Sequence, residues 1–188
     1  MKGSSVTAAC RGFYDYVTSG HYGMFTWTIN NIQLPKAFPD TPLKIVTTPF
    51  EHRQYMNVCT FGYTMPYWGW EQWERELDWM ALHGIDMPLS PIGSEAIFAR
   101  VWRSLGLTEE EIGDFMAGAA HLPWFRMGNM SGIDGHPSQE WYDKTIALEH
   151  KIIDRMNELG MSPVYNAFAG FVPKGLKRVF PDAELVET

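Results

Sequence analysis

The sequence predicts an α/β fold in which short strands of a parallel sheet alternate with helices. Three short apolar segments, at residues 55–63, 85–90 and 162–170, have the composition of buried strands. Stretches long enough for helices separate them, and parallel strands need crossover connections of that length. With 188 residues, the chain is shorter than the roughly 250 residues of a complete eight-unit βα barrel.

A helix is predicted over residues 70–83, directly after the first strand and its loop. Trp73, Leu77 and Met80 fall on one side of this segment at helical spacing. Gly84 follows, and glycine is the residue that most often ends a helix because it adopts the left-handed conformation without strain. We therefore expect an amphipathic helix whose tryptophan-rich side packs against the sheet.

Three later helices are predicted over residues 94–105, 109–117 and 139–159. Thr108 and Glu111 have the spacing of a capping box, which marks the start of the second of these helices. The apolar residues of the third recur at helical spacing over its whole length.

A long glycine- and asparagine-rich loop is predicted over residues 121–137. Loops of this length inside compact domains are usually functional or disordered, and the aromatic residues here favour function. A short helix is expected from Pro173 to about residue 179.

The composition changes in a proline-rich connector at residues 33–42, which predicts two domains. Before it, a helix is expected over residues 4–19 and a strand over residues 25–29. We therefore expect residues 1–45 to be the C-terminal part and linker of a small α/β domain. Residues 46–188 are expected to carry the βα series.

The charge and cysteine content limit the classes of function. The net charge of -7 and the scattered basic residues argue against nucleic acid as a partner. No apolar run is long enough to span a bilayer, and the N-terminus lacks the apolar core of a signal peptide. Two cysteines do not make a disulfide scaffold. No metal or other cofactor is predicted, and the oligomeric state is not indicated.

The aromatic content, 14% with 8 tryptophans, is the unusual feature of the composition. Tryptophan and tyrosine rings pack on sugar rings, so the excess fits a carbohydrate-binding protein. The alternative is that these large rings fill a large core.

Candidate site residues come from the expected carboxyl ends of the strands, where parallel α/β folds place their active groups. Asn57 and Cys59 are two residues apart on the first strand, so they are expected to face the same side and to line one pocket. Two interpretations remain open for Asn57, a pocket residue or a partner for a buried backbone group. For Cys59, a pocket-lining role is favoured over a nucleophile, because no histidine has a recognisable pairing with it.

The carboxylates in the helices are interpreted mainly as structural. Glu71, Glu74, Glu76 and Asp78 lie in the helix over residues 70–83, and Glu71, Glu74 and Asp78 share its polar side, so a solvated face explains them better than acid–base chemistry. Two interpretations are open for Glu95, contact with a ligand or a favourable interaction with the dipole of its helix, and the second is preferred.

Five motifs in order along nearly the whole chain resemble the α-N-acetylglucosaminidases, glycoside hydrolase family 89. They are YMNVCT at 55–60, WERELDWMAL at 73–82, EAI at 95–97, WFRMGN at 124–129 and NAFAG at 166–170. The run Tyr67-Trp68-Gly69-Trp70 departs from the family pattern, which leaves the shape of the first loop open.

The resemblance implies a partial (β/α)8 TIM-type barrel, preceded by the end of a small α/β domain. It implies a retaining glycosidase whose partner is a glycan with terminal α-linked N-acetylglucosamine. The two catalytic glutamates of the family are expected beyond Thr188, so no catalytic residue is assigned and the chain alone is expected to be inactive. The family suggests a secreted, periplasmic or lysosomal protein; the compartment itself is not indicated.

The resemblance also assigns three substrate-binding residues. Asn57 and Cys59 match pocket residues of the family's first barrel strand, and Trp124 matches an aromatic wall of the sugar pocket. The alternatives are a non-catalytic carbohydrate-binding or structural βα module, or a barrel glycosidase for another sugar.

Overall fold

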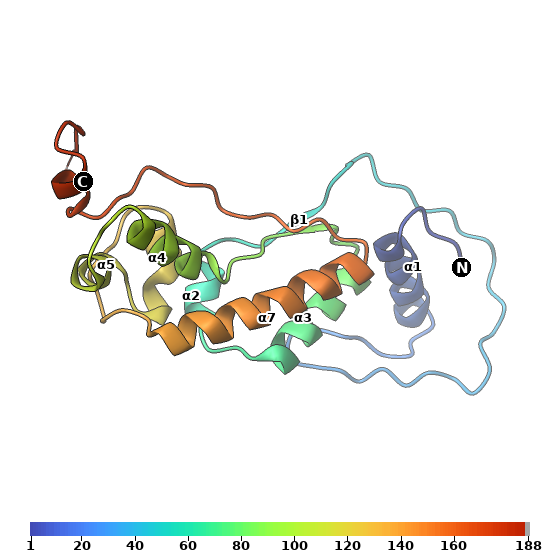
Figure 1. Ribbon diagram of the computed structural model, residues 1–188. Helices are drawn as coiled ribbons and strands as arrows, with labels where there is room; N and C mark the ends of the chain where they lie inside the picture. Colours follow the sequence, from blue (N-terminus) through green and yellow to red (C-terminus); the bar gives the residue numbers. More distant parts are fainter. Residues whose placement is uncertain (187–188) are drawn as a thin grey trace. The chain divides into compact units, whose positions relative to one another are not determined.

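The computed structural model describes residues 1–186 of the chain, which divide into two compact units (Figure 1). Unit 1 consists of residues 1–55, 70–89 and 152–164. Unit 2 consists of residues 56–69, 90–151 and the described residues from 165 onward. Each unit is therefore assembled from segments that are far apart in the sequence.

Unit 1 is built on two helices that pack on each other, α1 (Val6–Ser19) and α3 (Trp70–Leu82). Ser5 caps α1, where its side chain accepts a hydrogen bond from the Ala8 amide at 3.1 Å. The predicted apolar side of α3 is confirmed as its buried side, and Gly84 follows the helix with a φ of +77°. The core of this unit contains Tyr14, Val17, Trp73, Leu77, Met80, Ile152 and Met156.

The predicted parallel pairing of strands is confirmed, but the strands are very short. β1 (Gln54–Tyr55) pairs in parallel with β2 (Met87–Pro88). Beyond β2, Leu89 forms a parallel bridge with Val164, whose amide donates to the Pro88 carbonyl at 2.9 Å. The third predicted strand, residues 162–170, is therefore reduced to one bridge within the described residues.

The predicted strand over residues 55–63 is wrong beyond Tyr55. The Asn57 side-chain oxygen accepts a hydrogen bond from the Cys59 amide at 2.8 Å, and helix α2 (Thr60–Thr64) follows at once. A side-chain acceptor of this kind gives the backbone an alternative to the hydrogen bonds of a sheet. The local turn, followed by a helix, replaces the expected strand.

The predicted strand over residues 25–29 is also wrong. Phe25 forms an isolated antiparallel bridge with Asn30, and the residues between them make a tight turn. The Thr26 hydroxyl oxygen accepts a hydrogen bond from the Ile29 amide at 3.1 Å, which holds this turn closed. A turn of so few residues leaves no length for a strand.

Unit 2 contains α2 and a set of later helices around an aromatic core. These are α4 (Ser94–Ser104), α5 (Glu109–Phe115), the 3-10 helix η1 (Ala119–His121), α6 (Leu122–Arg126) and α8 (Leu176–Val179). Helix α7 (Gln139–Glu158) contributes its residues through 151 to unit 2 and the rest to unit 1. The core of unit 2 includes Phe61, Ala99, Trp102, Phe115, Met116, Leu122 and Phe125.

The helix boundaries in unit 2 partly confirm the sequence analysis. The capping box is present, because the Thr108 hydroxyl accepts from the Glu111 amide at 3.2 Å while the Glu111 carboxylate accepts from the Thr108 amide at 2.8 Å. The loop predicted over residues 121–137 is wrong in its first part, where Pro123 lies in the first turn of α6 and favours the start of a helix. The last short helix begins at Leu176 rather than at Pro173.

Candidate functional site

The structure places all three predicted sugar-site residues in unit 2. Asn57 is exposed, and its side chain is engaged in the turn with the Cys59 amide. Cys59 is half-buried and immediately precedes α2. The two residues are therefore neighbours through a turn, whereas the sequence analysis expected them to share one face of a strand.

Trp124, on α6, lies against α2, which Cys59 precedes. Its ring meets the Tyr63 ring edge-on, with centroids 5.5 Å apart and planes at 88°. A Cβ atom at Gly62 would lie 2.8 Å from Trp124 Cζ3, so only glycine allows the ring to approach the α2 backbone this closely. Trp124 is half-buried and Tyr63 is 78% exposed, so the pair presents aromatic surface beside the Asn57–Cys59 turn.

A buried ion pair in the same unit was missed by the sequence analysis. Arg126 Nε and Nη2 donate to the two oxygens of Glu95 at 2.6 and 3.1 Å. The two side chains are only 1% and 0% exposed. The guanidinium carbon of Arg126 also lies 4.7 Å from the centroid of the Phe61 ring on α2. Glu95 does lie in the first turn of α4, as the sequence predicted, and both of its oxygens are in addition bound by arginine.

A second buried carboxylate, Glu149, belongs to the same unit. The Ser90 hydroxyl donates a hydrogen bond to it, and its side chain is almost fully buried. Burial raises the pKa of Glu149 to about 7, while Ser90 and the charge of Arg126 act in the opposite direction. Within the described residues, five buried polar atoms of this unit lack a hydrogen-bond partner: Trp102 Nε1, His121 Nδ1, Arg126 Nη1, Glu149 Oε2 and Asn166 Nδ2.

In unit 1, the carboxylate of α3 that lies outside the predicted polar side, Glu76, is buried. Glu76 is only 4% exposed and forms a hydrogen bond with the Tyr55 phenol. Burial is the largest effect on the pKa of Glu76 and raises it, while the Tyr55 hydrogen bond opposes the rise. Glu71 and Glu74 are exposed, and Asp78 is paired with Arg155 at 2.7 Å.

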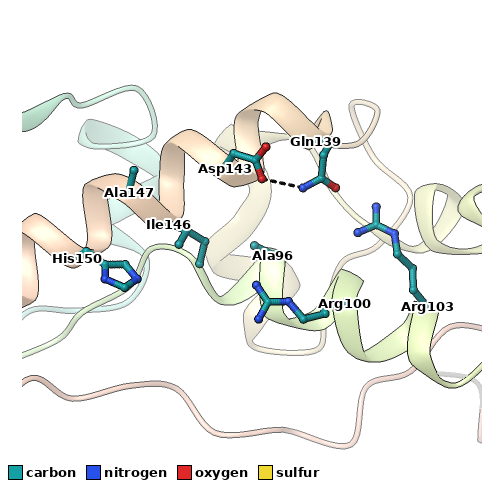
Figure 2. Close-up of a pocket in the computed structure, with 8 residues that line it drawn as sticks. All are labelled: Ala96, Arg100, Arg103, Gln139, Asp143, Ile146, Ala147 and His150. Atoms are coloured by element: carbon teal, nitrogen blue, oxygen red, sulfur yellow. Dashed lines mark hydrogen bonds between the residues drawn. The ribbon is translucent and has the colours of Figure 1, made fainter.

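A groove of about 380 Å³ lies between α4 and α7 in unit 2. Figure 2 shows Arg100 and Arg103 projecting from α4, and His150 and the hydrogen-bonded pair Gln139–Asp143 on α7. None of the three predicted sugar-site residues lines it. The groove is therefore separate from the Asn57–Cys59 turn and Trp124.

Within residues 1–186, no three histidine, cysteine, aspartate or glutamate side chains group as ligands for a metal ion. No helix in this part of the chain has the length and apolar character needed to cross a membrane.

Parallel strand segments that are each followed by a helix are βα units, which define the class of α/β proteins. Residues 53–188 match the family described as "Alpha-N-acetylglucosaminidase (NAGLU) tim-barrel domain", and the chain therefore belongs to this family. The resemblance drawn from the five sequence motifs is confirmed.

Relatives in sequence and in structure agree with this assignment. The chain is 41% identical to human α-N-acetylglucosaminidase over 188 residues, which is all of this chain and 25% of the human protein. CpGH89 from Clostridium perfringens, solved with two glutamates changed to glutamine and with its substrate GlcNAc-α-1,4-galactose, has a TM-score of 0.90 and 32% identity. That match covers 97% of this chain and 21% of the other.

A family 89 glycoside hydrolase from the same bacterium, in complex with 2-acetamido-1,2-dideoxynojirimycin, has a TM-score of 0.86 and 31% identity. This match covers 97% of the present chain and 21% of the bacterial protein. The present chain thus spans about a quarter of the length of the curated relative that it matches.

Proposed function

We propose that this chain is part of a retaining glycosidase that removes terminal α-linked N-acetylglucosamine from glycans. The observation that carries the proposal is the 41% identity to human α-N-acetylglucosaminidase over the whole chain. The related CpGH89, held with GlcNAc-α-1,4-galactose, supports the same class of substrate.

The proposed sugar site is formed by Asn57, Cys59 and Trp124. The Asn57 amide would hydrogen bond to a hydroxyl or to the acetamido group of the sugar. The Trp124 ring would pack on an apolar sugar face, as aromatic rings with one open face do in carbohydrate sites. The close approach of Trp124 to α2, which directly follows the Asn57–Cys59 turn, supports a single site.

The proposed chemistry needs two carboxylates about 5 to 5.5 Å apart, one as nucleophile and one as acid–base. We place both in parts of the full-length protein outside this chain. Glu95 is not a candidate for proton transfer, because Arg126 occupies both of its oxygens. Glu76 belongs to unit 1, whereas the three proposed site residues belong to unit 2.

The domain division predicted from the sequence remains part of this proposal. Residues 1–45 would end a small α/β domain, and residues 46–188 would form the first portion of the barrel. The family match that begins at residue 53 supports a boundary in this region.

Hydrolysis by the full-length protein tests the proposed function. We expect cleavage of para-nitrophenyl α-N-acetylglucosaminide, little cleavage of the β-anomer or of the α-glucoside, and the α-anomer of the free sugar as the first product in proton NMR. Asn57→Ala should lower kcat/KM by about tenfold or more, as loss of a substrate hydrogen bond does. Asn157→Ala, an exposed site on α7, is the matched control.

Three results would contradict the proposal. The first is a preference for the β-anomer. The second is the β-sugar as first product, because it would mean inversion. The third is sugar binding without any turnover, which would favour a non-catalytic carbohydrate-binding module.

A further inference from the structure

Arg126 is a buried cation that the proposed sugar site does not use. It lies on α6, two residues after Trp124, and is 6% exposed. Two contacts from two other helices hold its guanidinium. Glu95 on α4 accepts from Nε and Nη2, and the guanidinium carbon lies over the Phe61 ring on α2, 4.7 Å from its centroid.

These two contacts determine the orientation of Arg126 completely. A bidentate carboxylate fixes the plane of the guanidinium and the direction in which its nitrogens point. The Phe61 ring limits how closely the guanidinium approaches α2, and it adds a cation–π attraction. Because the backbone of Arg126 belongs to α6, the same contacts set the position of α6 against α2 and α4.

Helices α6 and α2 are the elements that hold the proposed sugar site together. Trp124 is on α6, and α2 directly follows the turn of Asn57 and Cys59. The space between them is already tight, since a Cβ at Gly62 would lie 3.0 Å from Pro123 Cγ and 2.8 Å from Trp124 Cζ3. A small shift of α6 would therefore move the Trp124 ring relative to Asn57 and Cys59.

Packing alone does not explain a charged pair at this place. Removing a guanidinium and a carboxylate from water costs free energy, and apolar side chains of similar size often stabilise a core at least as well. Arg126 also leaves Nη1 without a hydrogen-bond partner among the described residues. The ion pair fixes the direction in which the Arg126 side chain points, and an apolar pair of similar size does not.

We propose that Arg126 is a positioning residue for the sugar site, which sets the Trp124 ring at the correct distance from Asn57 and Cys59 through Glu95 and Phe61. The inference rests on the proposed function and extends it to a residue that does not touch the sugar.

The test uses the full-length enzyme and a double-mutant cycle. Arg126→Lys keeps the charge but loses the bidentate contact, so kcat/KM for the α-N-acetylglucosaminide should fall by about tenfold or more, mostly through KM. If Arg126 acts through Trp124, the same change in a Trp124→Ala background should add less than about a twofold loss. Arg178→Lys, in the exposed bidentate pair with Glu111, is the control and should leave kcat/KM within about twofold.

Phe61→Leu provides a second cycle that does not depend on the folding of Arg126→Lys. It keeps an apolar side chain on α2 and removes the ring under the guanidinium. We expect Phe61→Leu to lower kcat/KM by about threefold in the parent and to have little effect in the Trp124→Ala background.

The outcomes separate the two proposals. An inactive parent enzyme would contradict the proposed function. An active parent whose Arg126→Lys variant is folded and unchanged in kcat/KM would contradict the positioning role alone. If Arg126→Lys lowers kcat/KM by the same factor in the parent and in the Trp124→Ala background, the positioning role is also contradicted, because Arg126 then acts independently of the ring.

Discussion

Unit 1 and unit 2 each bury a glutamate from a helix, but they do so in different ways. Glu76 of unit 1 has a phenol as its partner, and burial raises its pKa. Glu95 of unit 2 has both oxygens bound by a guanidinium that is itself 1% exposed. Glu149, also in unit 2, resembles Glu76, because its one hydrogen bond comes from the Ser90 hydroxyl.

The difference shows two solutions to the cost of a buried carboxylate. A buried carboxylate with a neutral partner avoids the cost of a buried charge by remaining protonated to higher pH, as a raised pKa indicates. A bidentate arginine instead satisfies both carboxylate oxygens and fixes the relative orientation of the two side chains. In unit 2, the arginine of that pair lies on α6, the helix that also carries Trp124.

The largest expected effect comes from breaking the ion pair on the glutamate side. Glu95→Ala leaves the Arg126 charge buried and unpaired, which should destabilise the protein by about 3–5 kcal/mol. Urea denaturation of the full-length protein measures this loss. Glu110→Ala, an exposed residue in the first turn of α5, should change stability by less than about 0.5 kcal/mol. Equal effects of the two variants would contradict the account of Glu95.

A smaller effect, with a defined pH dependence, is expected from Glu149→Gln. The pKa of Glu149 is raised from 4.5 to about 7, so the folded state keeps a proton that the unfolded state has already released. Stability should therefore fall as the pH rises from about 4.5 to about 7, by up to about 3 kcal/mol.

Glu149→Gln removes this dependence and should raise the melting temperature at about pH 8 but not at about pH 4.5. Glu76→Gln should act in the same direction, because its pKa is also raised by burial. Glu140→Gln, in an exposed pair with Lys144, is the control. A melting temperature that rises equally at both pH values would contradict the role assigned to the Glu149 proton.

The smallest effect is expected at an arginine–carboxylate pair near the surface. Asp78 and Arg155 of unit 1 are 2.7 Å apart, with side chains 42% and 31% exposed. Asp78→Asn should cost less than about 1 kcal/mol, and less again at high salt, because water and ions screen the pair. A loss of stability as large as that of Glu95→Ala would contradict the claim that buried pairs contribute more to stability than exposed pairs.

The helices of this protein were largely predictable, because their signals are local. The apolar periodicity of α3 and the capping box at Thr108 and Glu111 were both found in the structure. The strands were not predictable in length, since a strand depends on its neighbours and a local turn can replace it. At Asn57, one side-chain hydrogen bond to Cys59 ends the strand that the apolar pattern suggested.

The partners of the buried charged side chains were not predictable from the sequence. Helical spacing puts Glu74 on the polar side of α3 and Glu76 on the side of Trp73 and Met80, but it does not say what a buried carboxylate contacts. The partners lie far along the chain, as Arg126, the partner of Glu95, is 31 positions away. Of the candidate site, sequence motifs indicated Trp124 but gave no reason to single out Arg126.

The measurement that tests the central claim most directly is a calorimetric titration of the full-length protein with 2-acetamido-1,2-dideoxynojirimycin, the compound bound to the Clostridium perfringens relative. The account predicts binding that weakens by about tenfold or more in Trp124→Ala, because the ring loses its contact with the sugar-like face. Trp141→Ala, a half-buried tryptophan on α7, should bind like the parent. Equal affinity of the parent and Trp124→Ala would contradict the proposed sugar site.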